Sequence, residues 1–166
     1  GRTVAHNLGS EVGMIVVKST NATGNWWVYH RSAAGTVFGT TKAGEVFFQL
    51  ESTAAANDNI GWWNNTDATT TEFTLGSGPT NTSGTTYVAY VFAHNDGDGE
   101  FGPDGDADII KCGSFTTDGS GNFSVDLGFE PEFFLTKRTD AVQNWYIWDT
   151  MRGWTVSGLA NGLVPN

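Results

Sequence analysis

Residues 7–31 read NLGSEVGMIVVKSTNATGNWWVYHR, and residues 126–150 read DLGFEPEFFLTKRTDAVQNWYIWDT. The two stretches align without a gap at an offset of 126 − 7 = 119 residues. Where they differ, many positions exchange one apolar side chain for another, such as Ile15 for Phe134. The alignment therefore predicts a tandem repeat. The identical pairs are Leu8/Leu127, Gly9/Gly128, Glu11/Glu130, Lys18/Lys137, Thr20/Thr139, Ala22/Ala141, Asn25/Asn144 and Trp26/Trp145.

Each copy has the pattern of a β-hairpin. Residues 14–18 and 133–137 are short, mainly apolar runs, typical of a strand buried on both faces. A polar turn follows, and after it comes an aromatic strand at 25–29 in the first copy and 144–148 in the second. We expect the two hairpins to share one register, because a shift by one residue would turn every side chain to the opposite face.

The rest of the sequence favours an all-β fold. Further strands are predicted at 45–50, 72–75, 86–93, 109–115 and 122–127, with Gly, Ser, Thr and Asn between them. No helical pattern is available for the crossovers that parallel strands need, so the sheets should be antiparallel. The prediction is an antiparallel β-sandwich, jelly-roll-like, built as a tandem repeat.

The repeat also predicts the domain organisation. We expect a first β module at 1–93, an acidic Gly/Asp-rich linker loop at 94–108 and a second β module at 109–166. The first module has no counterpart of the strand at 109–115, and the second stops where the first is only reaching 45–50. We therefore expect a piece of something longer, with its open edge filled by another subunit, by a swapped strand, or by residues 109–115 folding back as the first strand of the first module.

Charge and composition exclude several classes of function. The formal net charge is −10, and such a surface repels a nucleic-acid backbone. No apolar run approaches the roughly 18–20 residues that span a bilayer, so membrane insertion is not expected. Cys112 is the single cysteine, which leaves no disulfide framework and indicates a buried structural thiol.

The linker concentrates carboxylates. Calcium binds six to eight oxygen ligands in flexible geometry, and a Gly-rich acidic loop can supply them. The spacing departs from the helix-loop-helix calcium motif, because the sixth position counted from Asp96 is Phe101 and not glycine. Two interpretations stay open, a non-standard calcium loop and a solvated acidic linker. The candidate ligands are Asp96, Asp98, Glu100, Asp104, Asp106 and Asp108.

A pair of adjacent tryptophans is the candidate glycan site. Neighbouring residues on a strand point to opposite faces, so one of Trp62 and Trp63 should face outward unless both sides are covered. Asn64, Asn65 and Asp67 lie beside them and can form hydrogen bonds with sugar hydroxyls. Core packing is the alternative, and it is the favoured interpretation for Trp26 and Trp145, which occupy equivalent positions of the repeat.

No residue pattern indicates catalysis. The three histidines, at positions 6, 30 and 94, show no metal-ligand spacing. There is no nucleophile elbow, and nothing pairs two carboxylates at the separation that glycoside hydrolysis needs. The sequence therefore predicts a protein that is not an enzyme.

Several short words resemble repeat modules of the tail-fibre and other virion appendage proteins of marine tailed phages. They are RTVAHNLG (2–9), YHRS (29–32), STAAA (52–56), WNNT (63–66), YVAYVFAH (87–94), GEFGPDGD (99–106), IIKCGSF (109–115) and WDTMRG (148–153). The resemblance spans nearly the whole chain. It implies a virion-associated, β-rich protein with a role in host recognition, and it brings no catalytic residues.

The expected function is therefore that of a structural or adhesive module in an extracellular virion appendage. Its partners would be further copies of the chain or other virion structural proteins, together with a cell-surface glycan. The alternatives are a secreted calcium-dependent carbohydrate-binding module and a bacterial surface adhesin. A polysaccharide-acting enzyme comes third.

Overall fold

The structure is a computed structural model that describes residues 1–35, 39–95, 101–153 and 163–164. Within these residues every regular element is a β-strand or a single turn of 3-10 helix. All of the strand pairings are antiparallel. The all-β, antiparallel class predicted from the sequence is therefore confirmed.

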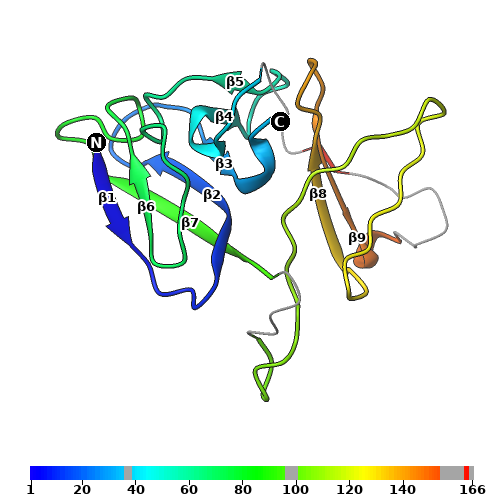
Figure 1. Ribbon diagram of the computed structural model, residues 1–166. Coiled ribbons are helices and arrows are strands. Elements are labelled where there is room, and N and C mark those ends of the chain that lie inside the picture. The colour runs from blue at the N-terminus through cyan, green and yellow to red at the C-terminus, as the bar shows by residue number, and fades with distance from the viewer. Residues whose placement is uncertain (36–38, 96–100, 154–162, 165–166) are drawn as a thin grey trace.

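The strands form three sheets (Figure 1). A five-stranded sheet has the order β5-β4-β3-β2-β7, and the pairs β1-β6 and β8-β9 form two smaller sheets. The strands are β1 (Arg2–Ala5), β2 (Glu11–Ser19), β3 (Trp27–His30), β4 (Val46–Gln49), β5 (Asn57–Asp58), β6 (Glu72–Leu75), β7 (Tyr87–His94), β8 (Phe133–Lys137) and β9 (Trp145–Asp149). The 3-10 turns are η1 (Arg31–Ala33), η2 (Ala43–Glu45) and η3 (Thr150–Arg152).

Strand β2 is buried on both of its faces, as its apolar run predicts. On one face Ile15 and Val17 pack with Trp63 beneath the β1-β6 pair, which contributes Phe73 and Leu75. The opposite face carries a second cluster that includes Val16, Val28, Phe48 and Trp145. Each of these fully buried apolar side chains contributes about 1.5–3 kcal/mol relative to exposure, so the core lies on both sides of this sheet.

The two hairpins share one register. In the first, Met14 lies opposite His30 and Val17 opposite Trp27; in the second, Phe133 lies opposite Asp149 and Thr136 opposite Tyr146. Each position of the second pairing is that of the first plus 119, since 133 − 14 = 149 − 30 = 119. No one-residue shift separates them, so the side chains keep their faces.

Features flanking the hairpins also recur at this offset. Gly9 and Gly128 precede them with φ angles of 80° and 79°. The Nζ atom of Lys18 donates to the carbonyl oxygen of Gly24, and Lys137 donates in the same way to Gln143. The turns η1 and η3 follow the second strands at matching positions. The local conformation therefore follows the repeated sequence beyond the strands themselves.

The second hairpin packs against the five-stranded sheet. Leu135 and Trp145 join the cluster that holds Val16 and Val28, and the Nε1 atom of Trp145 donates to the carbonyl oxygen of Gln49 over 2.9 Å. Backbone hydrogen bonds from Ala56 to Thr139 (3.0 Å) and from Gln143 to Thr53 (2.8 Å) flank this contact. The hairpin therefore docks through the face that carries Leu135 and Trp145, the repeat counterparts of Val16 and Trp26.

Two strand predictions were wrong. Residues 109–132 contain no strand, although 109–115 and 122–127 have the strand pattern, and Ile109 and Phe123 are 60% and 50% exposed. Conversely, β1 was not predicted, yet it pairs with β6 from Arg2 opposite Leu75 to Ala5 opposite Glu72. Strand preference depends on cross-strand packing, so a segment with a partner forms a strand and one without a partner does not.

Candidate functional site

The tryptophan pair of the predicted glycan site lies mostly within the protein. Trp63 is 1% exposed and packs edge-to-face on Tyr29 at 5.7 Å. Trp62 is half-buried, stacks on Phe47 with ring centroids 4.1 Å apart and meets the ring of Trp27 edge-on. Trp63 therefore offers no face to a sugar, and Trp62 uses one ring face for packing.

The polar residues beside them form a fixed turn. Asn64 and Asn65 both have left-handed backbone angles, with φ of 56° and 52°, a conformation that asparagine tolerates better than most residues. A carboxylate oxygen of Asp67 accepts from the backbone N–H of Gly44 over 2.8 Å. Asn64 and Asp67 are exposed, so the turn presents an amide and a carboxylate at the surface beside η2.

The close approach of η2 to this turn requires a glycine. A Cβ atom at Gly44 would overlap the backbone of Thr66. We expect Gly44→Ala to lower the free energy of unfolding by about 1–3 kcal/mol through overpacking. Denaturant unfolding measures this, with Gly113→Ala as the control, because a Cβ atom at Gly113 would meet nothing within 4 Å. Equal unfolding midpoints for the two variants would contradict the packing.

The acidic segment lies partly outside the described residues, which do not include Asp96, Asp98 and Glu100. Asp104 and Asp106 are exposed. Among the residues that are described, Asp108 included, no cluster of three or more His, Cys, Asp or Glu side chains could hold a metal ion. Calcium binding by this segment stays a prediction.

Asn95 closes the base of the acidic segment. It is fully buried, and its backbone N–H donates to the carbonyl oxygen of Ile110 over 2.9 Å. Its side-chain oxygen accepts from the backbone N–H groups of Ile109 and Ile110, at 3.3 and 3.4 Å. One buried amide therefore joins the two ends of the segment.

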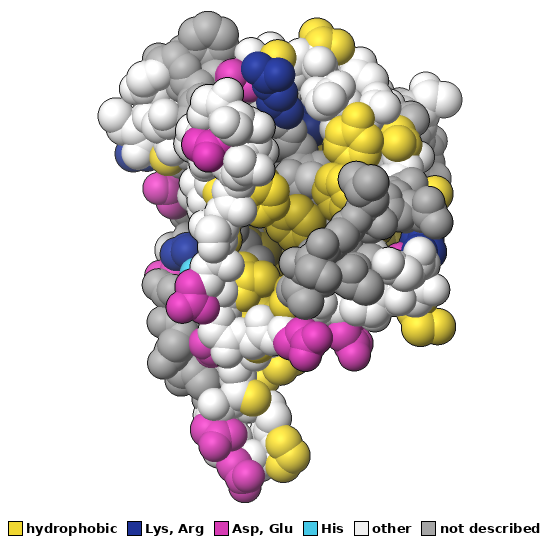
Figure 2. Space-filling view, turned by 90° about the vertical axis from the view of Figure 1, so that its right-hand side faces the viewer, with side chains coloured by type: hydrophobic (Ala, Val, Ile, Leu, Met, Phe, Trp, Pro, Cys, Tyr) yellow, Lys and Arg dark blue, Asp and Glu magenta, His cyan; other side chains and the backbone are white. Residues whose placement is uncertain are grey.

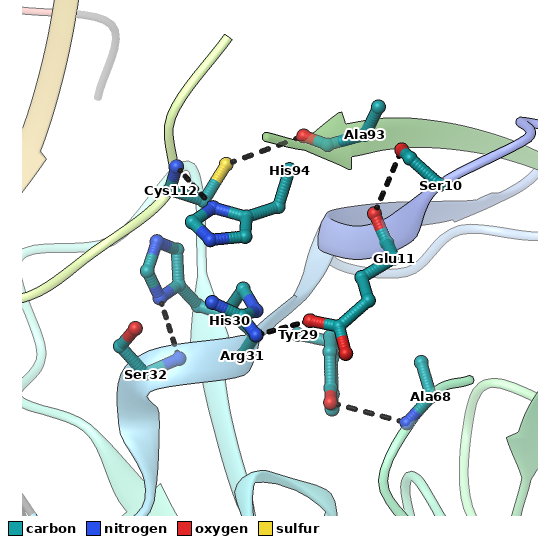
Figure 3. A network of polar contacts seen from close by, with 10 residues as sticks. All are labelled: Ser10, Glu11, Tyr29, His30, Arg31, Ser32, Ala68, Ala93, His94 and Cys112. Carbon is teal, nitrogen blue, oxygen red and sulfur yellow. Dashed lines mark hydrogen bonds and ion pairs between the residues drawn. The ribbon is translucent and has the colours of Figure 1, made fainter. Parts of the chain in front are cut away.

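A polar network lies at the ends of β2, β3 and β7 (Figure 3). His94 accepts at Nδ1 from the backbone N–H of Cys112 over 3.0 Å, and the Cys112 thiol donates to the carbonyl oxygen of Ala93 over 3.8 Å. On β3, which pairs with the other edge of β2, His30 accepts at Nδ1 from the backbone N–H of Ser32 over 3.2 Å. The sequence did not predict this network, because Cys112 lies 18 positions beyond His94 and no local pattern links the two residues.

The protonation states in this network argue for a structural role. Burial raises the pKa of the Cys112 thiol to about 11, so it stays protonated at neutral pH, and the thiolate is the nucleophilic form. Burial, with a smaller effect of Arg31 and His94, lowers the pKa of His30 to about 4. A neutral imidazole and a protonated thiol are stable components of a core. They are poorly prepared for nucleophilic catalysis.

A cleft of about 500 Å³ opens between the β1-β6 pair and the loop at 80–86. Arg2, Phe73 and Tyr87 contribute to its walls, and the loop, TNTSGTT, brings hydroxyl and amide groups to the rim. The Tyr87 hydroxyl accepts from the backbone N–H of Thr82 and donates to the carbonyl oxygen of Pro79, which fixes the loop. Sequence reasoning missed this cleft, and its one sequence signal was the run of hydroxyl side chains.

Comparison with known proteins places nearly the whole chain in one family. The family model described as a domain of unknown function, DUF7483, matches residues 1–165. No curated protein and no solved structure matches the chain. Among the described residues, no helix is long and apolar enough to cross a membrane.

Proposed function

The chain belongs to the DUF7483 family, and we propose that it is a non-enzymatic structural and adhesive module of an extracellular virion appendage, such as a phage tail fibre. In this proposal the repeat units form a β-sandwich of jelly-roll type, and they assemble with further copies or with other virion proteins. The resemblance of its sequence words to such appendage modules supports the assignment.

The observation that carries the proposal is the equivalence of the two hairpins. They share one register, and the second hairpin docks on the five-stranded sheet through Leu135 and Trp145. A unit that packs against its own repeat gives a rigid, extendable structure, because repeat proteins derive their stability from contacts between neighbouring units. Rigidity and length are what an appendage needs.

The adhesive part of the proposal rests on the cleft beside the loop at 80–86. Its volume of about 500 Å³ falls in the range of small-molecule sites, roughly 300–1,000 Å³. Thr82, Ser83 and Thr86 are exposed, and their hydroxyls can exchange hydrogen bonds with a sugar while Tyr87 supplies an aromatic wall. A cell-surface glycan is therefore the proposed ligand.

A glycan array tests the adhesive role. We expect the chain to bind a subset of cell-surface glycans, and the double variant Thr82→Ala, Ser83→Ala to lose at least about tenfold in affinity, or about 1.4 kcal/mol. Thr116→Ala, Thr117→Ala is the matched control, since it removes two exposed hydroxyls away from the cleft. Equal binding by both double variants would exclude the cleft, and the absence of any glycan ligand would refute adhesion through sugars.

Labelling tests the location. We expect antibodies raised against the chain to mark the appendages of the particles that encode it, in electron micrographs of intact virions. Labelling confined to secreted protein or to a bacterial cell surface would contradict the virion assignment and favour a secreted carbohydrate-binding module or an adhesin.

A further inference from the structure

Strand β2 is paired along both of its edges. One edge pairs with β3 and the other with β7, where eight residue pairs run from Glu11 opposite His94 to Ser19 opposite Tyr87. Strand β8, its counterpart at an offset of 119, pairs with β9 in the register of β2 with β3. No described strand pairs with the other edge of β8. The edge that β7 fills in the first half therefore carries no strand in the second.

The segment before β8 shows the same pattern. Residues 121–124 lie 119 positions after β1, since 121 − 2 = 124 − 5 = 119. Strand β1 pairs with β6 over four residues, whereas 121–124 form no strand. Phe123 there is 50% exposed, although its counterpart Val4 packs on the core. Both positions that β6 and β7 fill in the first half thus lack a described strand in the second.

Apolar side chains are also exposed in the second half of the chain. Figure 2, which shows the right-hand side of the view in Figure 1, has hydrophobic side chains gathered near the middle of that face, with Asp and Glu toward the lower rim. Phe115, Phe123 and Phe133 are 38%, 50% and 58% exposed, and the rings of Phe115 and Phe123 stack at 4.0 Å. Unpaired edges beside apolar surface are templates for strand addition, and proteins use such edges to bind extended peptides.

We infer that the outer edge of β8 binds an extended, antiparallel β-strand of the β7 type, which none of the described residues supplies. The pairing of β2 with β7 predicts both the side chains that the incoming strand should carry and its register on β8. Met14 faces Phe92 and Lys18 faces Val88 in the first half, so Phe133 and Lys137 should face the corresponding positions of the incoming strand. That strand should carry small and branched side chains on one face and aromatic ones on the other, as Ala89 and Val91 alternate with Tyr90 and Phe92 in β7.

The inference rests on the repeat that underlies the proposed function, and it names the kind of partner that would join one unit to the next. Main-chain hydrogen bonds along the edge would supply affinity, and the alternating side chains would supply specificity. The glycan array does not test it, because no residue of β8 lines the cleft.

A peptide with the sequence of residues 85–95, TTYVAYVFAHN, tests the inference on the whole chain. A photoreactive group at the peptide N-terminus allows its position to be mapped by mass spectrometry. We expect saturable binding, measured by fluorescence anisotropy, with cross-links to β8 or to the residues that flank it. The control peptide carries Tyr90→Pro and Val91→Pro, which remove two adjacent N–H donors and so disrupt pairing on either edge. It should bind at least about tenfold more weakly.

Three results would overturn the inference. They are no binding at any concentration, equal binding by the proline peptide, and cross-links confined to β2, which would mean that the peptide had displaced β7 instead of pairing with β8. If the peptide does not bind but the chain still binds glycans, only the inference of strand addition is refuted. Failure of the glycan array with peptide binding intact would remove only the adhesive role.

Discussion

We expect Trp145→Ala to lower the free energy of unfolding by about 3–5 kcal/mol, the range for deleting a large buried aromatic side chain. Trp145 is 5% exposed, packs edge-to-face on Phe48 at 5.9 Å and donates to the carbonyl oxygen of Gln49. It is also the buried residue that the second hairpin contributes to the cluster on the five-stranded sheet, where Leu135 packs beside it. Its removal should therefore loosen the β8-β9 hairpin as well as leave a cavity.

Trp26→Ala is the matched control, because Trp26 occupies the same position in the first copy of the repeat. Trp26 is half-buried and stacks on Tyr90 at 6.3 Å, so its truncation should cost only about 1–2 kcal/mol of transfer free energy. Denaturant unfolding compares the two variants. Hydrogen exchange of β8 and β9 should accelerate in Trp145→Ala and stay unchanged in Trp26→Ala. Equal losses of stability would show that Trp145 does not join the two halves.

The hairpins were predictable because two stretches of the sequence, 119 residues apart, show the same pattern. An apolar run that ends in lysine, a polar turn and an aromatic strand recur at a fixed offset, and the two registers agree pair for pair. Strands β4, β6 and β7 also lie where the sequence placed them, within a residue or two. Local pattern sufficed at these places, because each of the strands finds a partner within the same chain.

The docking of the second hairpin was not predictable in the same way. Trp26 and Trp145 have equivalent sequence environments, yet one lies at the margin of the core and the other within it. The difference arises from Gln49 and Phe48, which lie 96 and 97 residues before Trp145. Contacts over such separations leave no mark in the local pattern. The predicted strands at 109–115 and 122–127 failed for the same reason, since strand formation depends on a partner.

The candidate site shows a similar limit. Trp62 and Trp63 were singled out as adjacent aromatic residues on a strand, but they lie in turns, where alternation between faces does not apply. The cleft beside the loop at 80–86 is formed by β1, β6, β7 and that loop together. No single stretch of the sequence carries enough of it to be recognised.

We expect the protein to lose stability on acidification, because His30 is held neutral in the folded state. Its pKa falls from the usual 6.5 to about 4, through burial first and then the nearby charges of Arg31 and His94. Between these two pKa values the unfolded chain binds a proton that the folded chain does not. Above about pH 6.5 the histidine is neutral in both states and folding carries no penalty from it. As the pH falls from 6.5 toward 4, protonation favours the unfolded chain and the free energy of unfolding decreases.

The expected loss is about 3 kcal/mol between pH 7 and pH 4, at about 1.4 kcal/mol for each pH unit between the two pKa values. His30→Asn is the matched variant. The asparagine keeps an oxygen acceptor for the backbone N–H of Ser32. Asp149, the counterpart of His30 in the second hairpin, likewise has a side-chain oxygen that accepts from a backbone N–H, that of Arg152. Carboxylates titrate in the same range, so the quantity to measure is the difference in unfolding free energy between the two proteins as the pH falls. That difference should shift in favour of His30→Asn by about 3 kcal/mol from pH 7 to pH 4. A constant difference would show that His30 is protonated in the folded protein as readily as in the unfolded chain, and would place the origin of any acid sensitivity elsewhere.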